Sequence, residues 1–437
     1  MRRYVAYMAG FHACRGLVNS TLVLYLVDSL HLSLASTGAL LAIDLIATLI
    51  AEIPTGIYAD VRGRGRSFFL ACVLSFVGYL VYGCLPALAS GVSSGASVLA
   101  AAAVGEAALS VGFAFYSGAL DAWIVDSLST AGTSAPVGQV LARGQTWKNL
   151  SYMTSGVLGV MLYHAVQGFP FINGFLLSAL AALALTAYSR RLIDGAPRRD
   201  ATADLPPALR AALSEARQVL AASTRHVLAH RSLSWAIVAG GPCFALIQVL
   251  AYYWPYLLVK DMASDASPLG GNSAPALAAS WILGYGARAI GNEASRKLIG
   301  SRLPRAAVLA GVTVAGSALV TTLVVLPVLP GRVLPLDWVL AVSTLVYGAA
   351  RFFDGMADPL RQWLLADLTE AQGRATQFSI ASSFALAFSA LVALAAAGAL
   401  DHGFSVWHVL TVGALLQLTS APIYLFADRG RARNGHA

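Results

Sequence analysis

The chain has 437 residues, of which 57% are hydrophobic and only 11% are charged, with a mean hydropathy of +0.69. A soluble domain carries about 25% charged residues, so this composition excludes an ordinary water-soluble protein. The formal net charge of +8 comes from arginines that lie between apolar stretches, as in loops that orient a membrane protein. It therefore does not indicate a nucleic-acid-binding surface.

Apolar stretches long enough to cross a bilayer recur along the whole chain. A membrane-spanning helix needs about 20 mostly apolar residues, and continuous apolar runs without alternation exclude a transmembrane barrel. We expect twelve spans, at residues 4–27, 37–57, 67–89, 97–121, 139–164, 169–189, 233–259, 274–295, 305–329, 336–360, 374–399 and 405–427. The predicted fold class is an all-α polytopic membrane protein.

Basic residues mark the loops on one side of these spans. Lys and Arg collect in cytoplasmic loops. The chain places them at both ends and after spans two, six and eight: Arg2, Arg3, Arg62, Arg64, Arg66, Arg190, Arg191, Arg296, Lys297, Arg302, Arg305, Arg429, Arg431 and Arg433. The opposite loops hold only Lys260 and Arg332. Both termini are therefore predicted to be cytoplasmic in a cell membrane, and the scarcity of lysine beside arginine suggests a bacterial source.

The only long polar stretch, residues 190–232, divides the chain into halves at 1–189 and 233–437 with six spans each. Leucines on one face of this stretch predict an amphipathic helix on the inner membrane surface; a plain connector helix is the alternative. The ends of spans four and ten, residues 116–128 and 353–368, share an aromatic residue, Gly, Asp and Trp. This repeat indicates two pseudo-symmetric six-helix bundles.

The loop between spans two and three, residues 52–66, reads EIPTGIYADVRGRGR. Gly56, Asp60, Gly63 and Arg64 match the signature loop of the major facilitator superfamily, which this region resembles. Val61 and Gly65 depart from that pattern, where the family has basic residues. The resemblance extends to residues 117–128 and is to bacterial exporters of drugs and metabolites. It implies the fold of that superfamily and no cofactor.

The signature loop also predicts an inner gate. Glycines let two helix ends approach closely, and Asp60 can accept hydrogen bonds at a neighbouring helix N-terminus. Arg64 can then pair with Asp126 at the inner end of span four. The alternative is that the basic residues only keep this loop on the inside.

Charged and polar side chains inside the spans are the candidates for a solute cavity. A charge at mid-bilayer costs about 2.5–3.5 kcal/mol and usually faces the bundle interior, and spacings of three and four place residues on one helix face. The predicted cavity residues are His12, Arg15, Asn19, Gln248, Tyr252, Arg288, Arg351 and Asp354. Three alternatives stay open: His12 to Asn19 form a structural cluster, Arg351 only neutralises Asp354, and the span-seven aromatic residues form an interfacial belt.

Three acids lie deep enough to carry a coupling proton: Asp44, Glu106 and Asp121. Burial favours the neutral form of a carboxyl group, so such an acid can load and release a proton. Asp121 lies closer to the inner surface and also fits the gate. The alternative is that each acid is an ion-pair partner for a buried cation.

The function that these features predict is secondary active transport of a small organic solute by alternating access. From the resemblance we expect proton-coupled export of a drug or metabolite by a monomer embedded in lipid. Span five has Gly156 and Gly159 but lacks the Gly-Pro run of proton-antiporting drug exporters. The alternative is therefore uptake of an anionic solute, by symport or uniport. No metal-ligand or nucleophile motif favours an enzyme.

Overall fold

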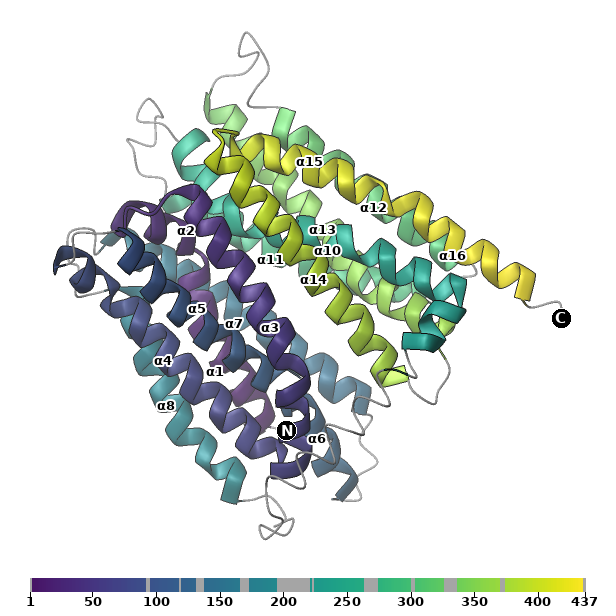
Figure 1. Cartoon of the computed structure of the whole chain (residues 1–437), viewed down its shortest axis with the longest axis horizontal. Helices are drawn as coiled ribbons and strands as arrows, with labels where there is room; N and C mark the ends of the chain where they lie inside the picture. The colour runs from purple at the N-terminus through teal and green to yellow at the C-terminus, as the bar shows by residue number, and fades with distance from the viewer. Residues whose placement is uncertain are drawn as a thin grey trace. The chain divides into compact units, whose positions relative to one another are not determined.

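The computed structural model describes residues 2–91, 95–117, 119–130, 137–165, 173–194, 221, 224–262, 274–299, 303–325, 336–369 and 374–434. The chain divides into two compact units, Met1–Ala216 and Arg217–Ala437. All regular structure in the described residues is helical (Figure 1). The division at Ala216 falls inside the predicted linker, whose residues 195–220 lie outside the described part of the chain, so the predicted boundaries and the amphipathic helix stay predictions.

Helices coincide with each of the twelve predicted spans. The first unit contains α1 (Arg2–Asn19), α2 (Leu22–Leu24), the π-helix η1 (Tyr25–Ser29), α3 (Leu34–Arg62), α4 (Arg64–Gly91), α5 (Gly95–Tyr116), α6 (Ala119–Thr130), α7 (Val137–Ala165) and α8 (Gly174–Asp194). The second contains α10 (Arg231–Tyr256), the π-helix η2 (Leu257–Met262), α11 (Ala274–Ile299), α12 (Arg305–Val325), α13 (Leu336–Leu368), α14 (Arg374–Asp401), α15 (Val406–Leu418) and α16 (Ser420–Asn434).

Length and hydropathy separate these helices into two groups. Eight segments of the described chain are long and apolar enough to cross a membrane. The remaining long helices are α1, α7, α11 and α13, and these carry most of the charged and polar residues that the sequence places inside spans. The prediction of an all-α polytopic membrane protein is confirmed, and the polar helices are where a site is expected.

The two units repeat one pattern of helix packing. In the first unit α1 packs on α7 and α8, α5 packs on α3 and α4, and α4 packs on α8. In the second unit α10 packs on α14 and on α15–α16, α13 packs on α11 and α12, and α12 packs on α15–α16. The first span of each unit also ends in a π-helix: η1 follows α2, and η2 follows α10. The order of pairing is therefore the same in both units, as expected for duplicated six-helix bundles.

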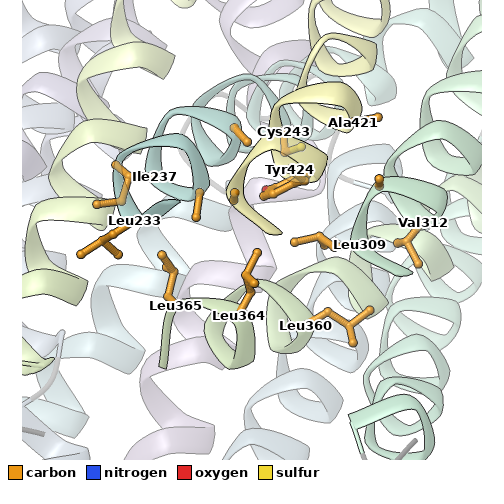
Figure 2. Close-up of a cluster of buried hydrophobic side chains, with 14 of the residues drawn as sticks. Leu233, Ile237, Cys243, Leu309, Val312, Leu360, Leu364, Leu365, Ala421 and Tyr424 are labelled. Atoms are coloured by element: carbon orange, nitrogen blue, oxygen red, sulfur yellow. The ribbon is translucent and has the colours of Figure 1, made fainter. Parts of the chain in front are cut away.

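Side-chain packing inside each unit is largely apolar. In the second unit a buried cluster joins α10, α12, α13 and α16 (Figure 2). Its labelled members are Leu233, Ile237, Cys243, Leu309, Val312, Leu360, Leu364, Leu365, Ala421 and Tyr424. Because lipid is as apolar as these side chains, association of the helices depends on close fit.

Glycines provide that close fit at two helix pairs. A Cβ at Gly159 of α7 would lie 1.9 Å from the backbone oxygen of Leu17 in α1. A Cβ at Gly355 of α13 would lie 2.2 Å from the backbone oxygen of Arg288 in α11. Small residues at such crossings let the backbones touch. Gly159, which the sequence analysis compared with exporter glycines, therefore has a packing role here.

The signature loop is a single-residue break between two long helices. Gly63 separates α3 from α4 with a φ of 95°, a conformation that favours glycine. A Cβ at Gly65 would lie 2.9 Å from the backbone oxygen of Leu192 at the end of α8. This close approach explains why Gly65 departs from the basic residue of the superfamily pattern.

Candidate functional site

Two acids, Asp44 and Glu106, form a polar cluster where α3, α4 and α5 meet in the first unit. The Ser110 hydroxyl lies 2.6 Å from Asp44 Oδ1 and 2.7 Å from the Glu106 backbone oxygen, so it donates to one of them at a time. The Tyr82 hydroxyl donates to Glu106 Oε2. Each carboxylate thus has a hydroxyl donor from a neighbouring position.

Arg15 of α1 supplies the positive charge near this acid pair. Its guanidinium lies 4.3 Å from the centroid of the Phe113 ring, a cation–π distance. It acts electrostatically on both Asp44 and Glu106, although no ion pair within 4 Å joins it to either in the described structure. The two acids therefore share one arginine, and the three side chains carry one negative charge in excess when both acids are ionised.

The other residues of the predicted stripe on α1 bind tyrosines. His12, which is only 3% exposed, lies 2.9 Å from the Tyr116 hydroxyl. The Asn19 amide donates to the Tyr152 hydroxyl over 2.7 Å. His12 accordingly lies in a structural hydrogen-bond cluster, the alternative that its spacing left open. Its predicted place in a cavity stays a prediction.

Asp121, the third acid candidate, lies in the first turn of α6. There it accepts a hydrogen bond of 2.6 Å from the Tyr4 hydroxyl of α1. A carboxylate is also favoured at a helix N-terminus. Its position is thus explained by local contacts, and its roles in proton coupling and in the gate remain predictions.

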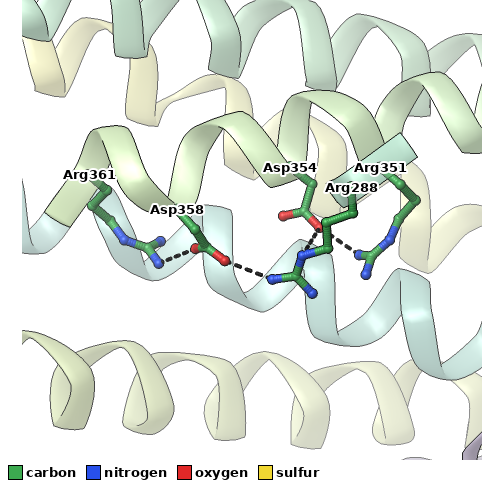
Figure 3. Close-up of polar contacts among 5 residues, drawn as sticks. All are labelled: Arg288, Arg351, Asp354, Asp358 and Arg361. Carbon is green, nitrogen blue, oxygen red and sulfur yellow. Dashed lines mark hydrogen bonds and ion pairs between the residues drawn. The ribbon is translucent and has the colours of Figure 1, made fainter. Parts of the chain in front are cut away.

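Five charged residues of the second unit alternate in sign along α13 and α11, and we call them the charge ladder. They are Arg361, Asp358, Arg288, Asp354 and Arg351 (Figure 3). Asp358 accepts hydrogen bonds from Arg361 Nη2 at 2.6 Å and from Arg288 Nη2 at 2.7 Å. Asp354 Oδ2 lies 2.7 Å from Arg351 Nη1 and 3.8 Å from Arg288 Nε. Both acidic partners of Arg288, which belongs to α11, therefore lie on α13.

The Asp354 end of the charge ladder is joined by an ion pair but not by hydrogen bonds. The Arg351 and Asp354 atoms are close, but neither carboxylate oxygen makes a hydrogen bond with the described residues, and neither do Nε and Nη1 of Arg351. Arg351 is nevertheless paired in charge with Asp354, as one of the two sequence interpretations proposed. Both residues also line a small cavity of about 30 Å³ between α10, α12, α13 and α15.

The aromatic run on α10 is mostly inside the bundle. Tyr253 and Trp254 are 0% and 2% exposed, and the Trp254 ring stacks on Tyr347 with centroids 4.3 Å apart. The belt interpretation is therefore wrong for these two residues, because belt side chains face the membrane interface. Gln248 and Tyr252 are half-buried, and their place in a cavity stays a prediction.

The predicted inner gate lies outside the described side chains, because those of Asp60 and Asp126 are not described. In the second unit, charged side chains join two helix ends. Arg305 at the start of α12 forms an ion pair with Asp367 at the end of α13 and lies 3.9 Å from the centroid of the Trp363 ring. Asp367 is the residue that the internal repeat aligns with Asp126.

Several residues of these clusters were missed by the sequence analysis. Arg361 continues the stripe of Asp354 and Asp358 at a spacing of three, and Ser110 follows Glu106 by four, so helical spacing could have found both. Tyr82 carries no such signal, because a tyrosine in an apolar span, here three residues after Tyr79, does not by itself indicate a buried acid as its partner. In the described residues, no group of three or more His, Cys, Asp or Glu side chains could hold a metal ion.

Comparison with known proteins identifies the fold. No family model matches the sequence, and no curated protein matches it either. Among solved structures, the nucleoside transporter NupG matches with 13% identity over 99% of this chain and 98% of its own, at a TM-score of 0.65.

Two further solved structures agree. A D-xylose–proton symporter matches with 16% identity over 96% of this chain and 95% of its own, at a TM-score of 0.67. The POT family transporter PepTSo matches with 13% identity over 99% of both chains, at a TM-score of 0.70. These likenesses confirm the predicted fold, that of major facilitator transporters, over essentially the whole chain.

Proposed function

We propose that this chain, which has the major facilitator fold, is a secondary active transporter rather than an enzyme. It moves a small organic solute by alternating access, as a monomer, and couples that movement to protons through Asp44 and Glu106. The observation that carries the proposal is the acid pair of the first unit, with Arg15 acting electrostatically on both acids.

The charge balance of this cluster is the physical reason for proton coupling. Uncompensated charge within a span is costly, and ionisable residues there commonly mark proton relays. With both acids ionised, the cluster of Arg15, Asp44 and Glu106 has one negative charge too many. One proton on either acid removes that excess, so the cluster alternates between two states that differ by a single proton.

The hydroxyl donors fit a proton that moves between the acids and water. Ser110 donates either to Asp44 or to a backbone oxygen, so it can release the carboxylate when that acid takes up a proton. The Tyr82 hydroxyl holds Glu106 from α4. Glu106 is therefore fixed in orientation, while Asp44 has an exchangeable partner.

Proteins with this fold support the coupling but do not specify the solute. The three matched structures are named as transporters of a nucleoside, of D-xylose with a proton, and of the POT family. These names cover different solutes, and one of them names a proton. The direction of transport, which the sequence predicts to be export, is left to experiment.

Transport by purified protein in liposomes tests the proposal. A panel of radiolabelled sugars, nucleosides, peptides and organic acids is offered with an inside-acid, an inside-alkaline or no pH gradient. We expect the gradient to drive flux of at least one solute in wild type, and Glu106→Gln and Asp44→Asn to lose this response. Asp401→Asn, which changes an exposed acid at the end of α14, serves as the matched control. If wild-type flux is the same with either pH gradient as with none, proton coupling is refuted.

A further inference from the structure

We infer that the charge ladder of the second unit binds the carboxylate of a monoanionic solute, and that Arg288 is the residue that contacts it. That the bound carboxylate belongs to a transported solute rests on the proposed function. Binding of the carboxylate involves only residues of the second unit. The inference comes from the charge of the ladder, the exposure of its members and the unused donors of Arg288.

The ladder carries one positive charge in excess, since three arginines face two aspartates. Asp354 and Asp358 are the carboxylates that act most strongly on Arg288, Arg351 and Arg361. A buried charge without a partner is unfavourable. One carboxylate would balance the ladder, whereas a phosphate group, with about −1.5 to −2 charge, would overcompensate it.

The exposed fractions of the side chains indicate that Arg288, among the three arginines, is the one that contacts the carboxylate. The Arg351 side chain is 3% exposed and that of Asp354 is 7% exposed, so this end of the ladder is sealed. The side chains of Arg288 and Asp358 are 28% and 27% exposed. A partly exposed cation within a span faces the bundle interior or a water-filled cavity in preference to lipid. Arg351, which the sequence predicts to line the cavity, is thus a buried neighbour of the site.

Arg288 also keeps hydrogen-bonding capacity. Its Nη2 donates to Asp358, but its Nε is 3.8 Å from Asp354, too far for a hydrogen bond. Its Nη1 has no partner in the part of the chain that the structure describes. A guanidinium binds a carboxylate through two parallel N–H groups. Arg288 therefore has donors available for a carboxylate while Asp358 holds it in place.

Asp354 competes with a bound carboxylate for the N–H donors of Arg288. Substitutions of Arg288 and of Asp354 should therefore change the affinity for a carboxylate in opposite directions. Removing Arg288 abolishes the site. Neutralising Asp354 leaves Arg288 without its loose partner and raises the excess charge of the ladder. Asp354→Asn should therefore strengthen carboxylate binding, while Arg288→Gln should weaken it.

The test is thermal stabilisation of purified protein in detergent by matched pairs of acids and amides. The probes are lactate with lactamide, benzoate with benzamide, and nicotinate with nicotinamide. We expect at least one acid to stabilise wild type where its amide does not. Arg288→Gln should weaken that binding at least tenfold. Arg288→Lys keeps the charge but loses the two parallel N–H groups of the guanidinium, so its affinity for the acid should lie between those of wild type and Arg288→Gln. Asp354→Asn should bind the acid more tightly than wild type. Arg231→Gln, at an exposed position at the start of α10, should match wild type.

The outcomes separate this inference from the proposed function. If no acid stabilises wild type more than its amide, or if Arg288→Gln binds the acid as wild type does, the inference is overturned. Should Arg288→Gln fail to fold, the opposite shifts of Arg288→Lys and Asp354→Asn decide. Arg288-dependent binding without gradient-driven flux in liposomes would uphold the carboxylate site and refute proton-coupled transport.

Discussion

Replacing Gly355 with alanine tests the helix contact on which the charge ladder depends. The added Cβ would lie 2.2 Å from the Arg288 backbone oxygen and 2.9 Å from its Cα. Ordinary contact begins at 3.4 Å, so α11 and α13 must separate by about 1.2 Å or bend, since backbone atoms cannot rotate away as a side chain does. Gly291 makes a similar contact with the Phe352 oxygen at 2.1 Å, which holds the two helices together one turn away.

The magnitude follows from two opposing effects. Overpacking costs about 1–3 kcal/mol, and a clash with backbone belongs at the upper end. Alanine gains about 1 kcal/mol over glycine within a helix. We therefore expect Gly355→Ala to lose about 2 kcal/mol. For a unit the size of Arg217–Ala437, 1 kcal/mol shifts Tm by about 2–4 °C, so the expected decrease is about 4–8 °C.

The matched control is Gly286→Ala on α11, where an added Cβ meets nothing within 4 Å. This variant gains only helix propensity, so its Tm should rise by about 2–4 °C. Both are measured by thermal unfolding of purified protein in one detergent. If Gly355→Ala is as stable as Gly286→Ala, the close approach of α11 and α13 is wrong, and with it the geometry assigned to Arg288.

Substitutions at three further residues probe other contacts. Trp254→Phe removes a buried indole N–H that has no partner in the described structure and should leave Tm close to that of wild type, whereas Trp254→Ala should lose about 3–5 kcal/mol in the same unfolding assay. Tyr82→Phe removes the donor to Glu106, a bond worth about 1.5–3 kcal/mol, and should lower gradient-driven flux in liposomes about tenfold; unchanged flux would exclude a role for this contact. Asp367→Asn breaks the partly exposed pair with Arg305 and should cost only about 1 kcal/mol, so a loss of 3 kcal/mol on unfolding would contradict this estimate.

The fold could be predicted from the sequence because its main determinants are local. Apolar runs of sufficient length become helices in lipid whatever their neighbours are, and all twelve spans coincide with helices. The π-helices η1 and η2 were not predicted, since nothing in their composition distinguishes them from α-helix. The close contacts of Gly159 and Gly355 depend on which helices meet, and that is decided by tertiary packing.

Only those features of the candidate sites that involve residues of one helix could be predicted from the sequence. Helical spacing places Arg351 and Asp354 on one face of a span, and both belong to the charge ladder. Spacing could not show that Arg351 is sealed while Arg288 is partly open, because exposure depends on the helices packed around them. For the same reason Trp254 resembles a membrane-belt residue in sequence but stacks inside the bundle.

The two charged clusters occupy equivalent places in the repeated architecture. Asp44 and Ser110 meet between α3 and α5, and the charge ladder joins α11 and α13, the corresponding pair of the second unit. The excess charge has opposite sign, negative around Asp44 and Glu106 and positive around Arg288. A duplicated bundle begins with identical interfaces, so this opposite sign shows that the two equivalent helix pairs have diverged in charge. In the functions we propose, a proton would balance the first cluster and a carboxylate would balance the second, because each removes one unit of charge that its own bundle leaves unbalanced.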